Sequence, residues 1–99
     1  MAAAQSTEGA SSWTFFTNHA HVLFVLASNP DARTRDIADA VHITERAAQR
    51  IVHELEEGGY IRIVKKGRRN SYVLNDKKKL RHPIEKHASV ATLIGALGF

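Results

Sequence analysis

The sequence predicts a mainly helical α+β domain in which three helices precede a two-stranded β-hairpin and a short helix ends the chain. Up to residue 57, apolar residues recur at the spacing of helices, and after Gly59 they alternate with polar residues, as in strands. The length of 99 residues is that of one compact domain with tails. These observations exclude an all-β chain and a chain of several domains.

The three helices are delimited by residues that favour helix starts and stops. Ser and Thr side chains cap helix N-termini, and a residue before proline leaves the helical conformation. The first helix is apolar almost all round, which predicts a central and buried position. The expected spans are Asn18–Ser28 capped by Thr17, Arg35–Val41 capped by Thr34, and 45–57 capped by Thr44.

The strands follow directly after the Gly58-Gly59 pair, which is expected to end the third helix in a left-handed conformation. Alternation predicts strands over Tyr60–Lys65 and Ser71–Asn75, joined through residues 66–70. The last apolar segment predicts a short helix that begins near Ser89.

The positive charge is concentrated in one part of the chain. Residues 60–81 hold nine of the fourteen Lys and Arg residues and a single acid, Asp76. This segment therefore carries a charge of +8, whereas the net charge of the whole chain is +4. Such a local field predicts a polyanionic partner, nucleic acid above all. A solvated surface is the alternative reading of the same charge.

Two short helices joined by a break and followed by a basic hairpin form a helix-turn-helix with a wing. The third helix turns one polar stripe outward, and Arg and Gln are the side chains that pair with guanine and adenine edges. We therefore expect this helix in the major groove of double-stranded DNA, with the wing, residues 65–70, on the minor groove or backbone. The expected base-reading residues are Arg46, Gln49, Arg50 and His53. The expected backbone and wing contacts are Arg35, Thr44, Lys65, Lys66, Arg68, Arg69 and Tyr72.

The stretch Thr34 to Ile61 resembles winged helix-turn-helix transcriptional regulators of the MarR and ArsR type. Its clearest marks are Asp36-Ile37-Ala38, the run from Leu55 to Ile61, and the wing behind them. The resemblance covers about residues 17–75 and implies a regulator that binds operator DNA as a dimer. One departure is His42, which stands where such regulators commonly have glycine at a positive φ angle.

The chain is expected to comprise a disordered tail (1–12), the winged helix-turn-helix domain (13–75), and a basic link with a C-terminal dimerisation helix (76–99). Both ends carry more apolar side chains than one small domain needs, which predicts a twofold homodimer. In the alternative, the last helix covers the first within one chain. The expected interface residues are Trp13, Phe15, Phe16, Val90, Leu93, Ile94, Leu97 and Phe99.

Other functions find less support in the sequence. Neither a secretion signal nor an apolar run of about 20 residues is present, so we expect a cytoplasmic protein without membrane contact. The chain has no cysteine and no catalytic motif, so no enzyme activity, cofactor or metal is expected. Two alternatives stay open: a winged-helix protein–protein interaction module, and a metal-sensing repressor that uses histidines at the dimer interface. The sequence identifies no small-molecule effector.

Overall fold

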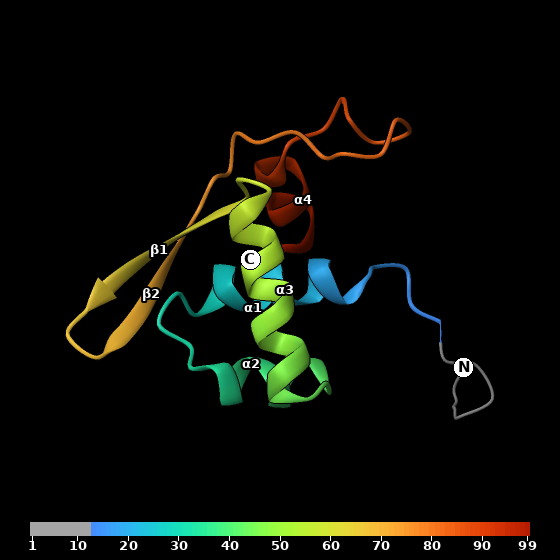
Figure 1. Cartoon of the computed structure of the whole chain (residues 1–99). Coiled ribbons are helices and arrows are strands. Elements are labelled where there is room, and N and C mark those ends of the chain that lie inside the picture. Colours follow the sequence, from blue (N-terminus) through green and yellow to red (C-terminus); the bar gives the residue numbers. More distant parts are fainter. Residues whose placement is uncertain (1–12) are drawn as a thin grey trace.

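The computed structural model describes residues 13–99, and the expected tail, residues 1–12, lies outside them. Four helices and one antiparallel hairpin follow each other as predicted, which confirms the mainly helical α+β class with a winged helix-turn-helix (Figure 1). In chain order the elements are α1 (Asn18–Ser28), α2 (Thr34–Val41), α3 (Glu45–Glu57), β1 (Ile61–Lys66), β2 (Arg69–Leu74) and α4 (Val90–Leu97).

Helix α1 lies at the centre of the domain, as its apolar composition predicted. It contacts α2, α3 and β2, and the side chains of Val22, Leu23 and Leu26 are buried. The hydroxyl of Thr17 accepts a hydrogen bond from the Ala20 amide at 3.3 Å, so the predicted cap is confirmed. α1 therefore provides the platform on which the other helices pack.

The turn between α2 and α3 holds the two helices against α1. Helix α2 begins one residue earlier than predicted, because the Asp36 carboxylate accepts from the amide of Arg33 at 3.0 Å and makes Arg33, not Thr34, the N-cap. After α2, His42 adopts the left-handed conformation with φ 67° and ψ 46°. This is the conformation for which the turn favours glycine.

Helix α3 starts and ends where the sequence predicted. The Thr44 hydroxyl accepts from the Ala47 amide at 3.0 Å. At the other end Gly59 has φ 82°, while the amide of Tyr60 donates to the Leu55 carbonyl at 2.9 Å. This pair of features is a Schellman ending, and it turns the chain directly into β1.

The strands reach closer to the turn than the sequence predicted, and Tyr60 and Asn75 lie outside them. Lys66 pairs with Arg69, so only Gly67 and Arg68 form the turn, with Gly67 at φ 66°. A glycine with positive φ at the first of two turn residues is the pattern of a type II′ turn, which suits the twist of a hairpin. The strands therefore extend as far as Lys66 and Arg69.

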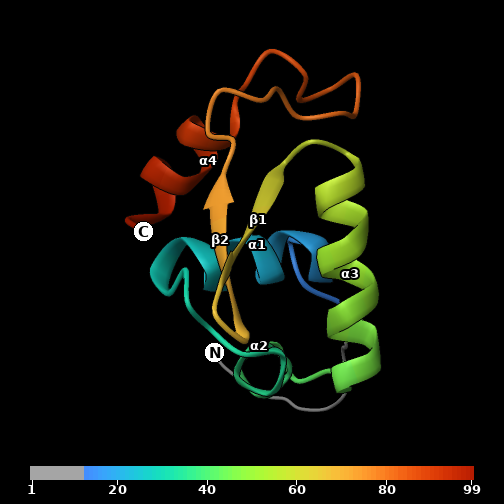
Figure 2. The same ribbon diagram turned by 60° about the vertical axis from the view of Figure 1, so that its left-hand side comes forward.

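One hydrophobic core joins the helices and the hairpin. Buried side chains of α1, α2, α3 and the hairpin meet Val90 of α4 in one cluster. Figures 1 and 2 show the segment after β2 at the end of the hairpin opposite its tip. Helix α4 begins next to Ser89, as predicted, and the Ser89 hydroxyl caps it by accepting from the Thr92 amide at 3.3 Å. Among residues 13–99, no helix has both the length and the apolar character to cross a membrane.

Candidate nucleic-acid interface

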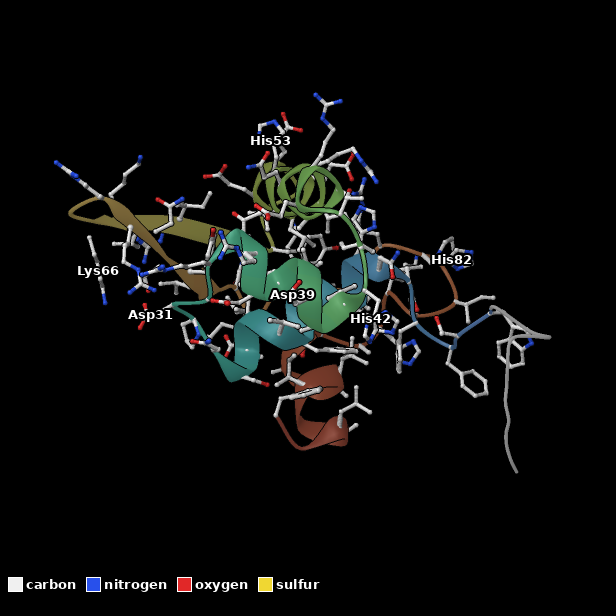
Figure 3. The ribbon with its side chains drawn as sticks, turned by 90° about the horizontal axis from the view of Figure 1, so that it is seen from below. Asp31, Asp39, His42, His53, Lys66 and His82 are labelled. Atoms are coloured by element: carbon white, nitrogen blue, oxygen red, sulfur yellow. The ribbon has the colours of Figure 1, made fainter. Side chains whose placement is uncertain are left out.

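Helix α3 presents one polar stripe to solvent and one apolar stripe to the core. Ala48, Ile51 and Leu55 are buried against the other elements. The four residues predicted to read bases, Arg46, Gln49, Arg50 and His53, are all exposed. In Figure 3 the His53 side chain points away from the body of the domain, on the face opposite α4. The stripe is thus free of the chain's own described segments.

Two residues of this stripe have carboxylate partners one turn further along α3. Arg50 Nη1 lies 3.4 Å from Glu54 Oε1, and His53 Nε2 lies 3.4 Å from Glu57 Oε2. Arg46 takes part in no ion pair among the residues that the structure describes. The part of the stripe on the first turns of α3 therefore has fewer ion pairs than the part that follows.

Glu54 joins the stripe to α1. Its Oε1 lies 2.6 Å from Nε2 of His19, so one carboxylate oxygen faces both His19 and Arg50. The hydrogen bond with His19, followed by the charge of Arg50, holds the pKa of Glu54 below its ordinary value, although partial desolvation opposes this shift. The carboxylate thus stays ionised beside the arginine.

The start of α3 carries a second set of predicted contacts. Arg35 Nε lies 4.0 Å from Glu45 Oε2, which links the first turns of α2 and α3. Thr44 is exposed and its hydroxyl caps α3. Glu45 stands in the first turn, where a carboxylate favours the helix dipole.

The wing divides its cations between two sides of the hairpin. Lys66 and Arg69 are directly opposite each other, so their side chains share one side, whereas Lys65 pairs with Asn70 on the other. Arg69 Nη2 donates to the Asp31 carbonyl at 3.0 Å and ties the wing to the loop after α1. Lys66 extends from the outer end of the hairpin in Figure 3. All four wing cations are exposed.

Two predicted site residues occupy the interior instead. Tyr72 was expected at the DNA backbone, but only 6% of it is exposed, because its strand packs on the loop after α1 and its amide donates to the Pro30 carbonyl at 2.9 Å. Val90 was expected in a dimer interface, yet it is completely buried within its own chain. Both side chains therefore belong to the core.

The comparison with protein families decides the relationship. The model of the MarR family matches residues 17–69, more than half of the chain. The chain belongs to the MarR family. The match extends from the cap of α1 to the start of β2, so it contains the whole helix-turn-helix. A search of curated proteins finds no match for the chain.

Membership of the MarR family establishes the general function. Members of the family are DNA-binding transcription regulators and not enzymes, so this chain is a regulator of that kind. The family match confirms the resemblance to MarR regulators. The resemblance to ArsR regulators stays a prediction.

The remaining apolar ends of this MarR-family chain meet on α1. Phe24 packs edge-on against Phe16 at 5.3 Å between ring centroids and stacks on Phe99 at 5.1 Å. Further out, Trp13 and Phe15 are 70% and 89% exposed. Of the other predicted interface residues, Leu93 and Ile94 are half-buried and Leu97 is exposed.

The histidines do not gather into a metal site. Within residues 13–99, no group of three His, Asp or Glu side chains has an arrangement that could hold a metal ion. His19 and His21 have different partners, Glu54 and the Asn18 amide oxygen at 3.4 Å. A metal site shared between two copies of the chain was one of the two alternatives, and nothing in the structure tests it.

Sequence reasoning missed two features of the interface. The contact between His19 and Glu54 joins residues 35 positions apart, and no local sequence pattern predicts such a pair. The lysines of the link after β2 were counted as charge but were not assigned to a site. The run Lys77-Lys78-Lys79 was the signal that could have indicated one.

Proposed function

We propose that this MarR-family chain binds specific double-stranded DNA as a twofold dimer, with α3 in the major groove and the wing on the minor groove or backbone. The observation that supports this proposal most directly is the exposed stripe of α3, opposite a side that is buried in the core. A recognition helix needs both properties, because it must be held rigidly while its side chains reach base edges.

Within the stripe, Arg46, Gln49, Arg50 and His53 are proposed to read bases. Arg46 and Gln49 lie in the first half of α3, the part that enters the groove most deeply in this fold. Arg50 and His53 each have a carboxylate partner one turn further along α3, which orients the side chain within the exposed stripe.

Phosphate contacts are proposed for the wing and for the N-terminal turns of the helix-turn-helix. The exposed cations of the wing suit the sugar-phosphate backbone or a narrow minor groove. The residues assigned to this role are Lys65, Lys66, Arg68, Arg69, Arg35 and Thr44. We leave Tyr72 out because it is buried.

Dimerisation is proposed through the apolar ends of the chain. Trp13, Phe15, Leu97 and Phe99 remain exposed after α4 has packed, and a second copy would remove them from water. Light scattering is expected to give twice the chain mass of 11.0 kDa. A mass of one chain at micromolar concentration would contradict the dimer.

The binding mode is tested by selecting bound sequences from a random duplex pool and then comparing two double variants. Arg46→Ala with Arg50→Ala is expected to abolish the preference for the selected sequence, because base contacts carry specificity. Lys65→Ala with Lys66→Ala is expected to weaken all sequences alike, because phosphates are common to all. An equal loss on every sequence from the first pair would contradict base readout. An absence of binding at low salt would favour the protein-interaction alternative.

A further inference from the structure

A hollow lined by cationic side chains lies between the end of α3 and the segment after β2. Its volume is about 710 Å³, and its lining includes Lys77, Lys78, Lys79 and Arg81 beside Tyr60. We call it the link hollow. Its two remaining lining residues, Gly58 and Asn75, carry no charge. Four cations around one concave surface form an anion site by charge alone.

The backbone of the link and the side chain of Lys78 have contacts within the fold. The backbone of Lys79 pairs with Ser89, and the Tyr60 hydroxyl donates to the Lys79 carbonyl at 2.8 Å. Lys78 Nζ lies 5.7 Å from the centroid of the Tyr60 ring, within the range of a cation–π contact. Because the backbone of the link is already positioned, an anion bound there has to order less of the chain.

Acidic side chains lie in a separate hollow that shares Gly58, Tyr60 and Arg81 with the first. This neighbour has a volume of about 620 Å³ and is lined by Glu54, Glu57 and Glu85 together with apolar residues of α1. The carboxylates and the lysines are thus sorted into two different hollows. An anion would be attracted to the link hollow and repelled from its neighbour.

The link hollow is remote from the tip of the wing. The segment after β2, which carries the lysines of the link hollow, lies at the end of the hairpin opposite its tip in Figures 1 and 2. From Arg69 to Leu74 the strand makes five steps of about 3.4 Å each, or about 17 Å. Phosphates held at the two places would belong to different parts of a duplex.

From this arrangement we infer that the link hollow binds backbone phosphates of the DNA that flanks the segment read by α3 and the wing. The inference rests on the proposed function, because it needs α3 and the wing on the same duplex. Lys77, Lys78, Lys79 and Arg81 supply the charge, and Tyr60 positions the link.

The test compares two double variants. The link variant carries both Lys77→Gln and Lys78→Gln, and the matched wing variant carries both Lys65→Gln and Lys66→Gln. Binding is measured by fluorescence anisotropy on duplexes of about one helical turn (~10 base pairs) and about three turns (~30 base pairs). The variant Lys77→Arg with Lys78→Arg keeps both charges, and Lys86→Gln removes an exposed cation that does not line the link hollow.

The link variant is expected to lose on the order of tenfold affinity for the long duplex at about 0.1 M salt, and its salt slope is expected to fall by about 2. It should bind the short duplex like the wild type, and the arginine variant should keep wild-type affinity for both. The wing variant should lose affinity for both duplexes, and Lys86→Gln should change neither.

Each departure from this pattern has a separate meaning. If the wing variant loses affinity while the link variant matches the wild type on the long duplex, the inference fails and the proposed function stands. If neither variant loses affinity, the proposed function fails as well. Equal losses on short and long duplexes would overturn the flanking position. Tripolyphosphate serves as a second probe, a free phosphate chain without DNA. If the link variant loses affinity for tripolyphosphate and for neither duplex, the ligand of the hollow is a soluble phosphate and the assignment to DNA is overturned.

Discussion

His19 of α1 and Glu54 of α3 are joined across the helix interface, with 2.6 Å between Nε2 and Oε1. The same carboxylate oxygen lies 3.4 Å from Nη1 of Arg50, a residue of the exposed stripe. A group on the platform helix thus orients the carboxylate that in turn holds an arginine of the proposed recognition surface. The behaviour of Glu54 consequently links the stability of the fold to the position of Arg50.

The first prediction concerns acid stability. The pKa of Glu54 lies below its ordinary value of 4.5, so its ionised form stabilises the fold above about pH 4.5, and this contribution is lost as the pH falls through the lowered pKa. In urea unfolding between pH 6 and pH 3, Glu54→Gln is therefore expected to show a smaller loss of stability than the wild type. Glu56→Gln, an exposed neighbour on α3, serves as the control and should follow the wild type. Identical pH profiles for Glu54→Gln and the wild type would contradict this role.

The second prediction concerns DNA affinity and applies to the proposed interface. Glu54→Gln removes a negative charge beside Arg50, which reduces repulsion of the phosphates and frees the guanidinium group. We expect affinity for random duplex to rise about two- to threefold at low salt and the gain to disappear at high salt. Discrimination between selected and random sequences should decrease, because Arg50 is no longer oriented. The same gain from Glu56→Gln, with discrimination retained, would show that only net charge matters.

The third prediction concerns the hydrogen bond that holds the link. Tyr60 is buried, burial raises its pKa, and its hydroxyl donates to the Lys79 carbonyl. Tyr60→Phe removes this donor and is expected to cost about 0.5–1.5 kcal/mol of unfolding free energy. Hydrogen exchange should accelerate most at the amide of Leu80, which donates to Ala88 within the link. A variant as stable as the wild type, with unchanged exchange at Leu80, would show that the bond contributes nothing.

Much of the fold could be predicted because its signals are local. Thr17, Thr44 and Ser89 cap the helices that follow them, and a cap needs only the next three residues. The start of α2 was misplaced by one residue because the carboxylate of Asp36 satisfies the amide of Arg33. The turn of the hairpin was predicted too long, since Arg69 and Asn70 are polar and resemble a loop although they pair with β1.

The site was predictable only where periodicity determines it. The spacing of four residues on α3 was enough to predict that they share an exposed face. Tyr72 and Val90 were misplaced because burial depends on which distant segment covers a residue: the loop at Pro30 contacts the strand of Tyr72, and the chain's own core encloses Val90. The link hollow likewise depends on packing between Tyr60 and lysines far along the chain.

The last prediction concerns the turn of the helix-turn-helix. His42 has φ 67°, a left-handed conformation that costs a residue with a Cβ atom about 1–2 kcal/mol and costs glycine almost nothing. Glycine also has more freedom in the unfolded chain, which offsets part of this gain. His42→Gly is therefore expected to stabilise the domain by a few tenths to about 1 kcal/mol, measured as a higher melting temperature and urea midpoint.

The matched variant His42→Ala keeps the Cβ atom and removes the imidazole ring. It should be less stable than the glycine variant, because alanine carries the same left-handed cost as other residues with a Cβ atom. His42 is exposed, so neither change disturbs the core. If His42→Gly melts at or below the wild-type temperature, the left-handed angle is not a source of strain, and the unfolded-state entropy of glycine outweighs any relief in the turn.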